Sequence, residues 1–346
     1  MKSKYCFEYS PEIETLLDNA VKSIRAEIES GEEAENIKFV VLGGGYGRGE
    51  GGVRIEGGKP PRIYNDLDFF VIAKDSADPR KIDSFFKKIS KEWTEKLGVD
   101  VDFGPAATAT YIQKRLHMLM WREMVLAGNV IFGDSESFKK TFALNADAPL
   151  PQCEIFKLLF NRYYGLFLAS LKLSAKELNE SERDFVARNI NKAVLAAGDA
   201  LVFDSLEFKF SSADKLEALK SLDYPPAAQD IAKAYEDALK FKRNPDCSAD
   251  AKILSERLKS AKRLCVGVLD FMFSRKTAKE TPWQKLKNLR KNLKSAKYFA
   301  KLPVPRPLFG SPAISMLRAL KKFLSEETIP DKAQIEAVKN IWKTIN

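Results

Sequence analysis

The stretch that decides the fold runs from Ile37 to Val71. It contains three informative blocks: IKFVVL at 37–42, GGGYGRGEGG at 43–52 and NDLDFFV at 65–71. The first block is apolar and has the length of a strand, and seven residues of the second block are glycine. A glycine-rich turn that leaves a buried strand exposes backbone N–H groups, which can hold a phosphate. The three blocks therefore predict a strand, a phosphate-binding turn and an acidic strand.

Two pairs of carboxylates follow this turn. Asp66 and Asp68 are two residues apart on the predicted strand, so both point to one face of the sheet while the apolar residues beside them face the core. Asp100 and Asp102 repeat the arrangement within VDVDF at 99–103. If the two strands are neighbours, three or four carboxylates meet at one place. Because such carboxylates repel one another unless a cation lies between them, the pattern predicts one or two Mg²⁺ ions, with Mn²⁺ as the alternative metal.

The apolar periodicity divides the chain into two parts. Up to residue 150 it predicts helices at 11–28, 79–97 and about 111–126, strands at 37–42, 66–73 and 99–103, and a hairpin arm at 53–56. After Pro151 the strand signals nearly vanish, and long helical patterns run at 153–173, 182–203, 227–241, 249–273 and 282–301. The sequence therefore predicts an α+β protein. A domain with a small mixed sheet occupies 1–150, and an all-α domain occupies 151–346 and includes a proline-rich connector at 302–312.

The composition excludes several kinds of chemistry. The 346-residue chain has one histidine, His117, which excludes a zinc site made of several histidines and argues against a Ser-His-Asp triad. We interpret His117 as a packed or surface residue. The four cysteines are far apart, which indicates isolated reduced thiols. No run approaches the roughly 18 apolar residues of a membrane helix, and the N-terminus lacks the form of a signal peptide, so we expect a cytoplasmic protein without a membrane partner.

The positive charge is concentrated in one segment. The chain carries a formal net charge of +10, and residues 275–301 contain ten Lys or Arg and one acidic residue. In the interpretation that we favour, residues 285–301 of this segment form a surface helix with solvated lysines and four buried apolar residues, Leu286, Leu289, Leu293 and Phe299. In the other interpretation the helix binds RNA or another polyanion, and Trp283 and Tyr298 stack on bases.

Two of these blocks together resemble a known family signature. GGYGRGE at 44–50 followed by NDLD at 65–68 resembles the signature of the DNA polymerase β-like nucleotidyltransferase superfamily, in which a Gly-Gly or Gly-Ser turn precedes an acid-x-acid strand. The residues of this motif are most similar to those of the nitrogen-regulatory uridylyltransferases and the minimal nucleotidyltransferases. The resemblance extends to about residue 135, and the later helices are similar only in kind to the helical partners of such enzymes. It implies a nucleotidyltransferase fold for residues 1–150.

The resemblance implies roles for the residues of the motif. Gly44 and Gly45 would hold the β- and γ-phosphates of a nucleoside triphosphate. Asp66 and Asp68 would bind Mg²⁺. A third carboxylate would complete the metal site and help to deprotonate the acceptor. Asp100 is our first choice for it and Asp102 the second, because DVDFGP at 100–105 resembles the third motif of the family.

Two further residues of the glycine-rich run have open roles. Arg48 and Glu50 either contact the triphosphate or pair with neighbouring residues. The run also departs from the family pattern, because Gly45 and Asp66 are 21 positions apart, more than the family usually has. The extra length holds the predicted hairpin, and it indicates either a specialised lid over the nucleotide or a degenerate site. Gly45 also stands where many members have serine.

These observations lead to a functional hypothesis with one alternative. We expect Mg²⁺-dependent transfer of a nucleoside monophosphate from a nucleoside triphosphate to an acceptor hydroxyl, with pyrophosphate as the leaving group. The sequence leaves the acceptor open between a protein, a small molecule and RNA, and it does not reveal the oligomeric state. The alternative is a non-catalytic module that binds a nucleotide or polyanion, or an antitoxin-like partner protein, and retains the fold.

Overall fold

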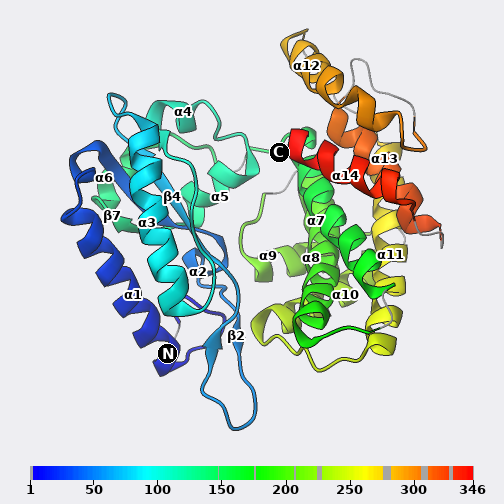
Figure 1. Ribbon diagram of the computed structural model, residues 1–346, viewed down its shortest axis with the longest axis horizontal. Helices are drawn as coiled ribbons and strands as arrows, with labels where there is room; N and C mark the ends of the chain where they lie inside the picture. Colours follow the sequence, from blue (N-terminus) through cyan, green and yellow to red (C-terminus); the bar gives the residue numbers. More distant parts are fainter. Residues whose placement is uncertain are drawn as a thin grey trace. The chain divides into compact units, whose positions relative to one another are not determined.

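The computed structural model describes residues 3–146, 148–174, 177–205, 208–223, 228–275, 282–304, 311–326 and 330–345 (Figure 1). It is a mixed α+β structure with a small mixed sheet and a helical C-terminal region, as the sequence predicts at this coarse level. The chain forms two compact units. The first comprises Met1–Leu150, Phe208–Asp214 and Lys240–Asp246, and the second comprises Pro151–Glu207, Lys215–Leu239 and Cys247–Asn346. Two short segments of the region that the sequence assigns to the helical domain therefore belong to the first unit.

A mixed sheet lies at the centre of the first unit. Its strands in the described part of the chain are β1 Ile37–Leu42, β4 Leu67–Ala73, β5 Val101–Phe103, β6 Ala107–Thr108 and β7 Asn129–Phe132. Their order is β5-β4-β1-β7, with β6 also paired to β4. β1 is antiparallel to β4 and β7, whereas β4 is parallel to β5 and β6. The three predicted strands are confirmed, and β4 and β5 are neighbours.

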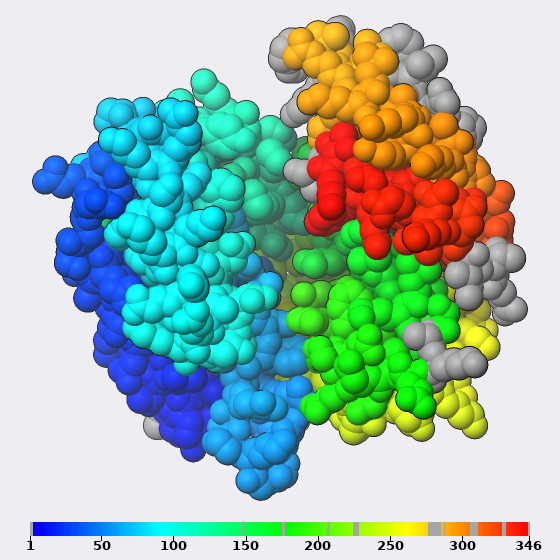
Figure 2. Space-filling model, in the orientation of Figure 1, coloured from blue at the N-terminus to red at the C-terminus, as the bar shows by residue number. Residues whose placement is uncertain are grey.

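Two long amphipathic helices cover one face of the sheet. They are α1 Pro11–Glu29 and α3 Pro79–Leu97, and both begin with a side-chain N-cap followed by proline. Gly98 ends α3 at a φ of +67°, a left-handed conformation that favours glycine. Their apolar faces share one core with alternate residues of β1, β4 and β5. Figure 2 shows the outer surface of both helices, in dark blue and cyan.

Shorter helices cover the opposite face of the sheet. They are α4 Ala109–Gln113, α5 Leu119–Ala127 and α6 Ser135–Thr141. The prediction of one helix at about 111–126 is wrong, because the chain breaks between α4 and α5 and leaves His117 exposed in a turn. Leu116 and Trp121 are both buried against this face of the sheet. Five residues of unbroken helix would separate them by about 140°, so the break places both side chains in one core.

A small hairpin separates the glycine-rich run from the acidic strand. Its arms are β2 Val53–Arg54 and β3 Arg62–Ile63, which pair antiparallel. The predicted hairpin arm is therefore confirmed, although the paired part is only two residues long on each side. A short 3₁₀ turn at Ala34–Asn36 precedes β1.

The regular secondary structure of the second unit is helical in the described residues, with turns and loops between the helices. Its helices, with the two that it shares with the first unit, are α7 Gln152–Leu173, α8 Glu180–Asp204, α9 Ser212–Lys220, α10 Ala228–Arg243, α11 Ala251–Ser274, α12 Pro282–Phe299, α13 Pro312–Ser325 and α14 Lys332–Ile345. α7 and α8 pack along each other, α11 packs on α8, and α13 packs on α7. No helix in the described ranges combines the length and apolar character needed to cross a bilayer. Most of the predicted connector, residues 305–310, lies outside the described residues.

The basic helix α12 does not bury the apolar stripe that the sequence predicts. Leu286 and Leu293 are 43% and 65% exposed, and the buried positions that accompany Phe299 are Asn292 and Ser295. The buried face packs against α14. The predicted stripe of Leu286, Leu289, Leu293 and Phe299 is therefore wrong in part. Apolar periodicity does not identify this buried face, because two of its residues are polar. The side chain of Trp283 lies outside the described residues, and Tyr298 has Lys297 over its ring.

Candidate functional site

The glycine-rich run begins with a backbone turn in which Gly44 adopts a left-handed conformation. After β1, the residues of α2 Gly44–Gly47 form a single helical turn. Gly44 has a φ of +58°, and a Cβ atom on it would lie 2.6 Å from Asp68 Oδ2. The left-handed conformation therefore favours glycine at this position, and any larger residue would have to displace the end of the Asp68 side chain. The first N–H groups of such a turn have no acceptor within the helix, so they are available to a ligand.

Strand pairing brings this turn and the acidic strand together. The Gly43 N–H donates to the Asp68 carbonyl oxygen at 2.8 Å, and the Asp68 side chain lies against Gly44. In the parallel pair β4–β5, Asp68 and Asp102 are in register. Residues in register on neighbouring strands project from the same face. The turn and two of the predicted carboxylates thus meet at one edge of the sheet.

Asp66 and Asp100 lie just before these two strands. Both are exposed, and the Leu67 N–H between Asp66 and Asp68 donates to the Asp100 carbonyl oxygen at 2.8 Å. The structure thus brings all four predicted acidic residues to the start of the same strand pair. Asp102 is the one that lies opposite Asp68, whereas Asp100 was the first choice for the third carboxylate.

The donor set suits a hard divalent cation in its chemistry. Carboxylate oxygens from Asp68 and Asp102 are what Mg²⁺ binds in proteins, and Mg²⁺ usually completes its octahedron with water and substrate phosphate rather than with an all-protein cage. In the described ranges, no three His, Cys, Asp or Glu side chains stand close enough to form a metal cage by themselves. The residues present therefore fit a cation held between two strands and a substrate.

The Tyr46 side chain forms hydrogen bonds that hold the glycine-rich run in place. Its side chain is buried, and its hydroxyl donates to the Gly52 carbonyl oxygen at 2.8 Å and accepts from the Tyr64 N–H at 2.9 Å. A Cβ atom on Gly51 would lie 2.2 Å from the Tyr46 ring, so the run folds closely over the ring. Burial raises the pKa of the Tyr46 hydroxyl, which keeps it protonated as a donor. The two ends of the hairpin insertion are thereby tied to one side chain.

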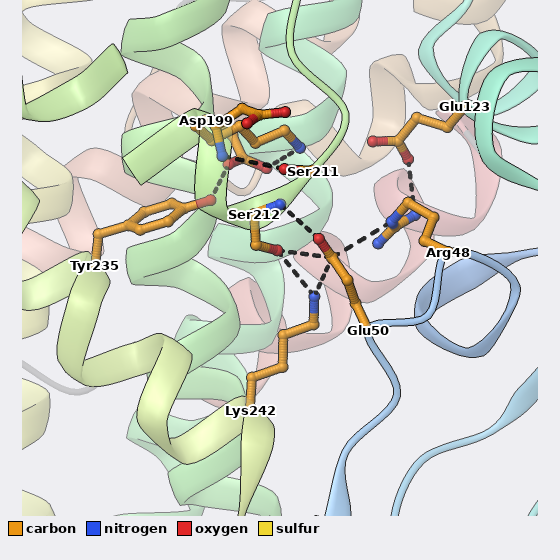
Figure 3. Close-up of polar contacts among 10 residues, drawn as sticks. Arg48, Glu50, Glu123, Asp199, Ser211, Ser212, Tyr235 and Lys242 are labelled. Atoms are coloured by element: carbon orange, nitrogen blue, oxygen red, sulfur yellow. Dashed lines mark hydrogen bonds and ion pairs between the residues drawn. The ribbon is translucent and has the colours of Figure 1, made fainter. Parts of the chain in front are cut away.

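Arg48 and Glu50 form ion pairs with each other and with neighbouring residues, and a contact of either residue with a triphosphate stays a prediction. Arg48 Nε lies 3.5 Å from Glu50 Oε2, and Arg48 Nη1 lies 3.6 Å from Glu123 Oε2 on α5. Glu50 is buried and also accepts two hydrogen bonds from Ser212 and one from Lys242. Figure 3 shows the Glu50 carboxylate between these partners. Its oxygen atoms are thus turned toward protein donors.

The environment of Glu50 keeps it ionised. Burial alone raises the pKa of its carboxyl, but the charges of Lys242 and Arg48 and the hydrogen bonds from Ser212 outweigh this effect and lower the pKa to about 2. The carboxylate is therefore negative at neutral pH.

Sequence reasoning did not find Ser212 and Lys242. They lie 162 and 192 positions after Glu50, on α9 and α10, and belong to the two short segments that join the first unit. No local pattern marks them. The sequence did contain one indication of such partners, because Glu50 lies within the glycine-rich run. A glutamate that is buried there needs cations or hydrogen-bond donors from other parts of the chain.

Comparisons with known proteins give no further guidance. No protein-family model matches this chain, and neither does any curated protein.

Proposed function

We propose that this protein is a Mg²⁺-dependent nucleotidyltransferase whose first unit has the nucleotidyltransferase fold. The observation that carries the proposal is the position of the Asp68 carboxylate, which lies against Gly44 of the turn and in register with Asp102 on the neighbouring strand. A phosphate-binding turn beside paired carboxylates is the arrangement that positions a triphosphate for transfer.

Each residue of the candidate site has a role in the proposed reaction. The N–H groups of Gly44 and Gly45 hold the phosphates of the nucleoside triphosphate. Asp68 and Asp66 hold Mg²⁺, and we place Asp102 rather than Asp100 as the third carboxylate because it is in register with Asp68. Mg²⁺, when bound, neutralises charge on the phosphates. Asp102 accepts the proton of the acceptor hydroxyl, which then attacks the α-phosphorus while pyrophosphate leaves.

The acceptor stays open between a protein side chain, a small molecule and an RNA 3′ end. The exposed basic surface of α12 is compatible with an anionic acceptor. The cytoplasmic location expected from the sequence stays a prediction.

Pyrophosphate release tests the proposal. The wild type is incubated with each labelled nucleoside triphosphate, Mg²⁺ and a panel of acceptors, beside Asp68→Asn, Asp102→Asn and Asp100→Asn. We expect Asp68→Asn and Asp102→Asn to lower release by at least about 100-fold, within the range usual for loss of a charge-stabilising or proton-accepting group, and Asp100→Asn to lower it much less. Glu92→Gln, on the exposed face of α3, is the matched control and should be unaffected.

Two other outcomes would change the proposed function or the proposed role of Asp102. Tight binding of a nucleoside triphosphate without release from any acceptor mixture would favour the non-catalytic binding module. A greater loss in Asp100→Asn than in Asp102→Asn would restore Asp100 as the third carboxylate.

A further inference from the structure

Glu50 is an unusual residue to find beside an anion-binding turn. Its side chain is 8% exposed, and its two carboxylate oxygens are taken up by the Ser212 N–H at 2.6 Å, the Ser212 hydroxyl at 2.7 Å and Lys242 Nζ at 3.1 Å. A buried carboxylate with these partners is costly to break, because removal of one member leaves a buried charge without compensation. The group formed by Glu50, Ser212 and Lys242 is called the Glu50 clamp below.

The backbone of the same residue closes the glycine turn. The Glu50 N–H donates to the Gly45 carbonyl oxygen at 2.8 Å, and a Cβ atom on Gly45 would lie 3.1 Å from the Glu50 carbonyl oxygen. Gly45 is therefore in direct contact with the main chain of Glu50. The Gly45 carbonyl belongs to the Gly45–Tyr46 peptide unit, which directly follows the peptide that carries the Gly45 N–H, so the position of Glu50 bears on the turn through this neighbouring peptide.

Glycine-rich backbone needs such support. Glycine has the greatest conformational freedom of all residues, so a run with seven glycines samples many arrangements unless other groups fix it. Tyr46 ties the later part of the run to Gly52 and Tyr64. The Glu50 clamp fixes the part that contains Gly45, and it does so through residues from α9 and α10.

We propose that Glu50 is a positioning residue for the triphosphate: the Glu50 clamp holds the Gly44–Gly45 peptide units in the orientation that binds phosphate. This inference rests on the proposed function. Glu50 itself does not touch the substrate and acts through the main chain of Gly45.

The first test needs no substrate. Hydrogen–deuterium exchange is measured on the ligand-free full chain for wild type, Glu50→Gln and the milder Ser212→Ala. We expect exchange in peptides that cover Gly43–Glu50 to rise at least about fivefold in Glu50→Gln and less in Ser212→Ala, with β4 unchanged. The matched control is Glu56→Gln, which removes an ion-paired glutamate of the same unit that lies in the hairpin. Unchanged exchange at the turn, or an equal rise throughout the first unit, would overturn the proposal.

The second test separates positioning from simple loss of structure. For the transfer reaction we expect Glu50→Gln and Lys242→Met to raise KM for the nucleoside triphosphate about tenfold and to change kcat less than threefold, with Glu50→Asp in between. Lys233→Met, at an exposed position of α10, is the control and should match the wild type. A uniform loss of kcat with KM unchanged would contradict the proposal.

The two tests also distinguish the failure of each idea. If the wild type neither binds nor turns over any nucleoside triphosphate, the proposed function fails, and the positioning role fails with it even if exchange at the turn responds to Glu50→Gln. If the wild type is active and Glu50→Gln leaves both KM and exchange at the turn unchanged, only the positioning role fails.

Discussion

Gly44 is the residue on which the candidate site depends most directly. It combines a left-handed backbone with a hydrogen atom where any side chain would meet the Asp68 carboxylate. Neither constraint is visible in the sequence, where Gly44 is one of three successive glycines. The structure therefore shows at which of these glycines the backbone conformation and the neighbouring carboxylate favour glycine.

Substitution of Gly44 tests this requirement. Gly44→Ala should destabilise the first unit by about 2 kcal/mol, because alanine is strained at a positive φ and its Cβ displaces Asp68. Gly57→Ala is the control, since no atom lies within 4 Å of the position of its Cβ. Urea unfolding monitored by far-UV circular dichroism measures both. Equal stability of the two variants would show that the turn tolerates a side chain at Gly44.

The ionisation of Glu50 predicts a pH dependence. Its pKa falls from an ordinary value of 4.5 to about 2 in the folded protein, so ionised Glu50 stabilises the fold above pH 4.5. This contribution, on the order of 3 kcal/mol, decreases as the pH falls from about 4.5 toward 2. Urea unfolding of wild type and Glu50→Gln between pH 6 and pH 3 should show a difference that shrinks with acidification. A constant difference over this range would contradict the assignment.

At the scale of elements, local patterns predicted the first unit well. Strand 37–42 and helix 79–97 follow from apolar periodicity and from caps at Asp78 and Gly98, which act within a few residues. The break between α4 and α5 could not be predicted, because it depends on where the sheet accepts Leu116 and Trp121. The start of α9 at Ser212 likewise has no periodic signal.

The same limit applies to α12. Its leucines suggest a buried stripe, yet the helix buries Phe299 together with small polar residues and leaves Leu293 in solvent. The covered face is the one that packs against α14, and apolar periodicity cannot identify a buried face that carries Asn292 and Ser295.

A pair of alanine substitutions on α12 checks this orientation. Phe299→Ala should destabilise the second unit by about 3 kcal/mol, because the side chain is 1% exposed and leaves a cavity. Leu293→Ala, on the exposed side, should change stability by less than about 0.5 kcal/mol. Thermal unfolding of the two variants measures the difference. A larger loss for Leu293→Ala would mean that the opposite face is the buried one.

At the scale of the whole molecule, the compact unit that holds the candidate site extends beyond the N-terminal 150 residues. The sequence predicted the acidic residues and the glycine turn because they lie on neighbouring elements. It could not predict that Phe208–Asp214 and Lys240–Asp246 complete the same unit, because such pairings depend on the folded path of the chain. The buried Arg122, whose guanidinium lies 4.1 Å from the centre of the Phe208 ring, is a second example.

A truncated chain tests the composition of this unit. A fragment of residues 1–150 lacks both later segments, so Glu50 loses Ser212 and Lys242 and becomes a carboxylate with fewer partners. We expect the fragment to be less stable than the same unit in the full chain by at least about 3 kcal/mol. Hydrogen exchange of the β1 and β4 amides in both proteins measures this loss. Equal protection would show that the later segments are dispensable.

The separation of Glu50 from Lys242 along the chain has a consequence for biosynthesis. The ribosome makes the glycine turn early, but the lysine that neutralises its acidic neighbour emerges 192 residues later. Until then the nascent first unit lacks its last two segments, and a polypeptide that stalls in between carries Glu50 without Ser212 and Lys242. Completion of the first unit thus waits for translation of residues 240–246, and a chain interrupted before them cannot complete it.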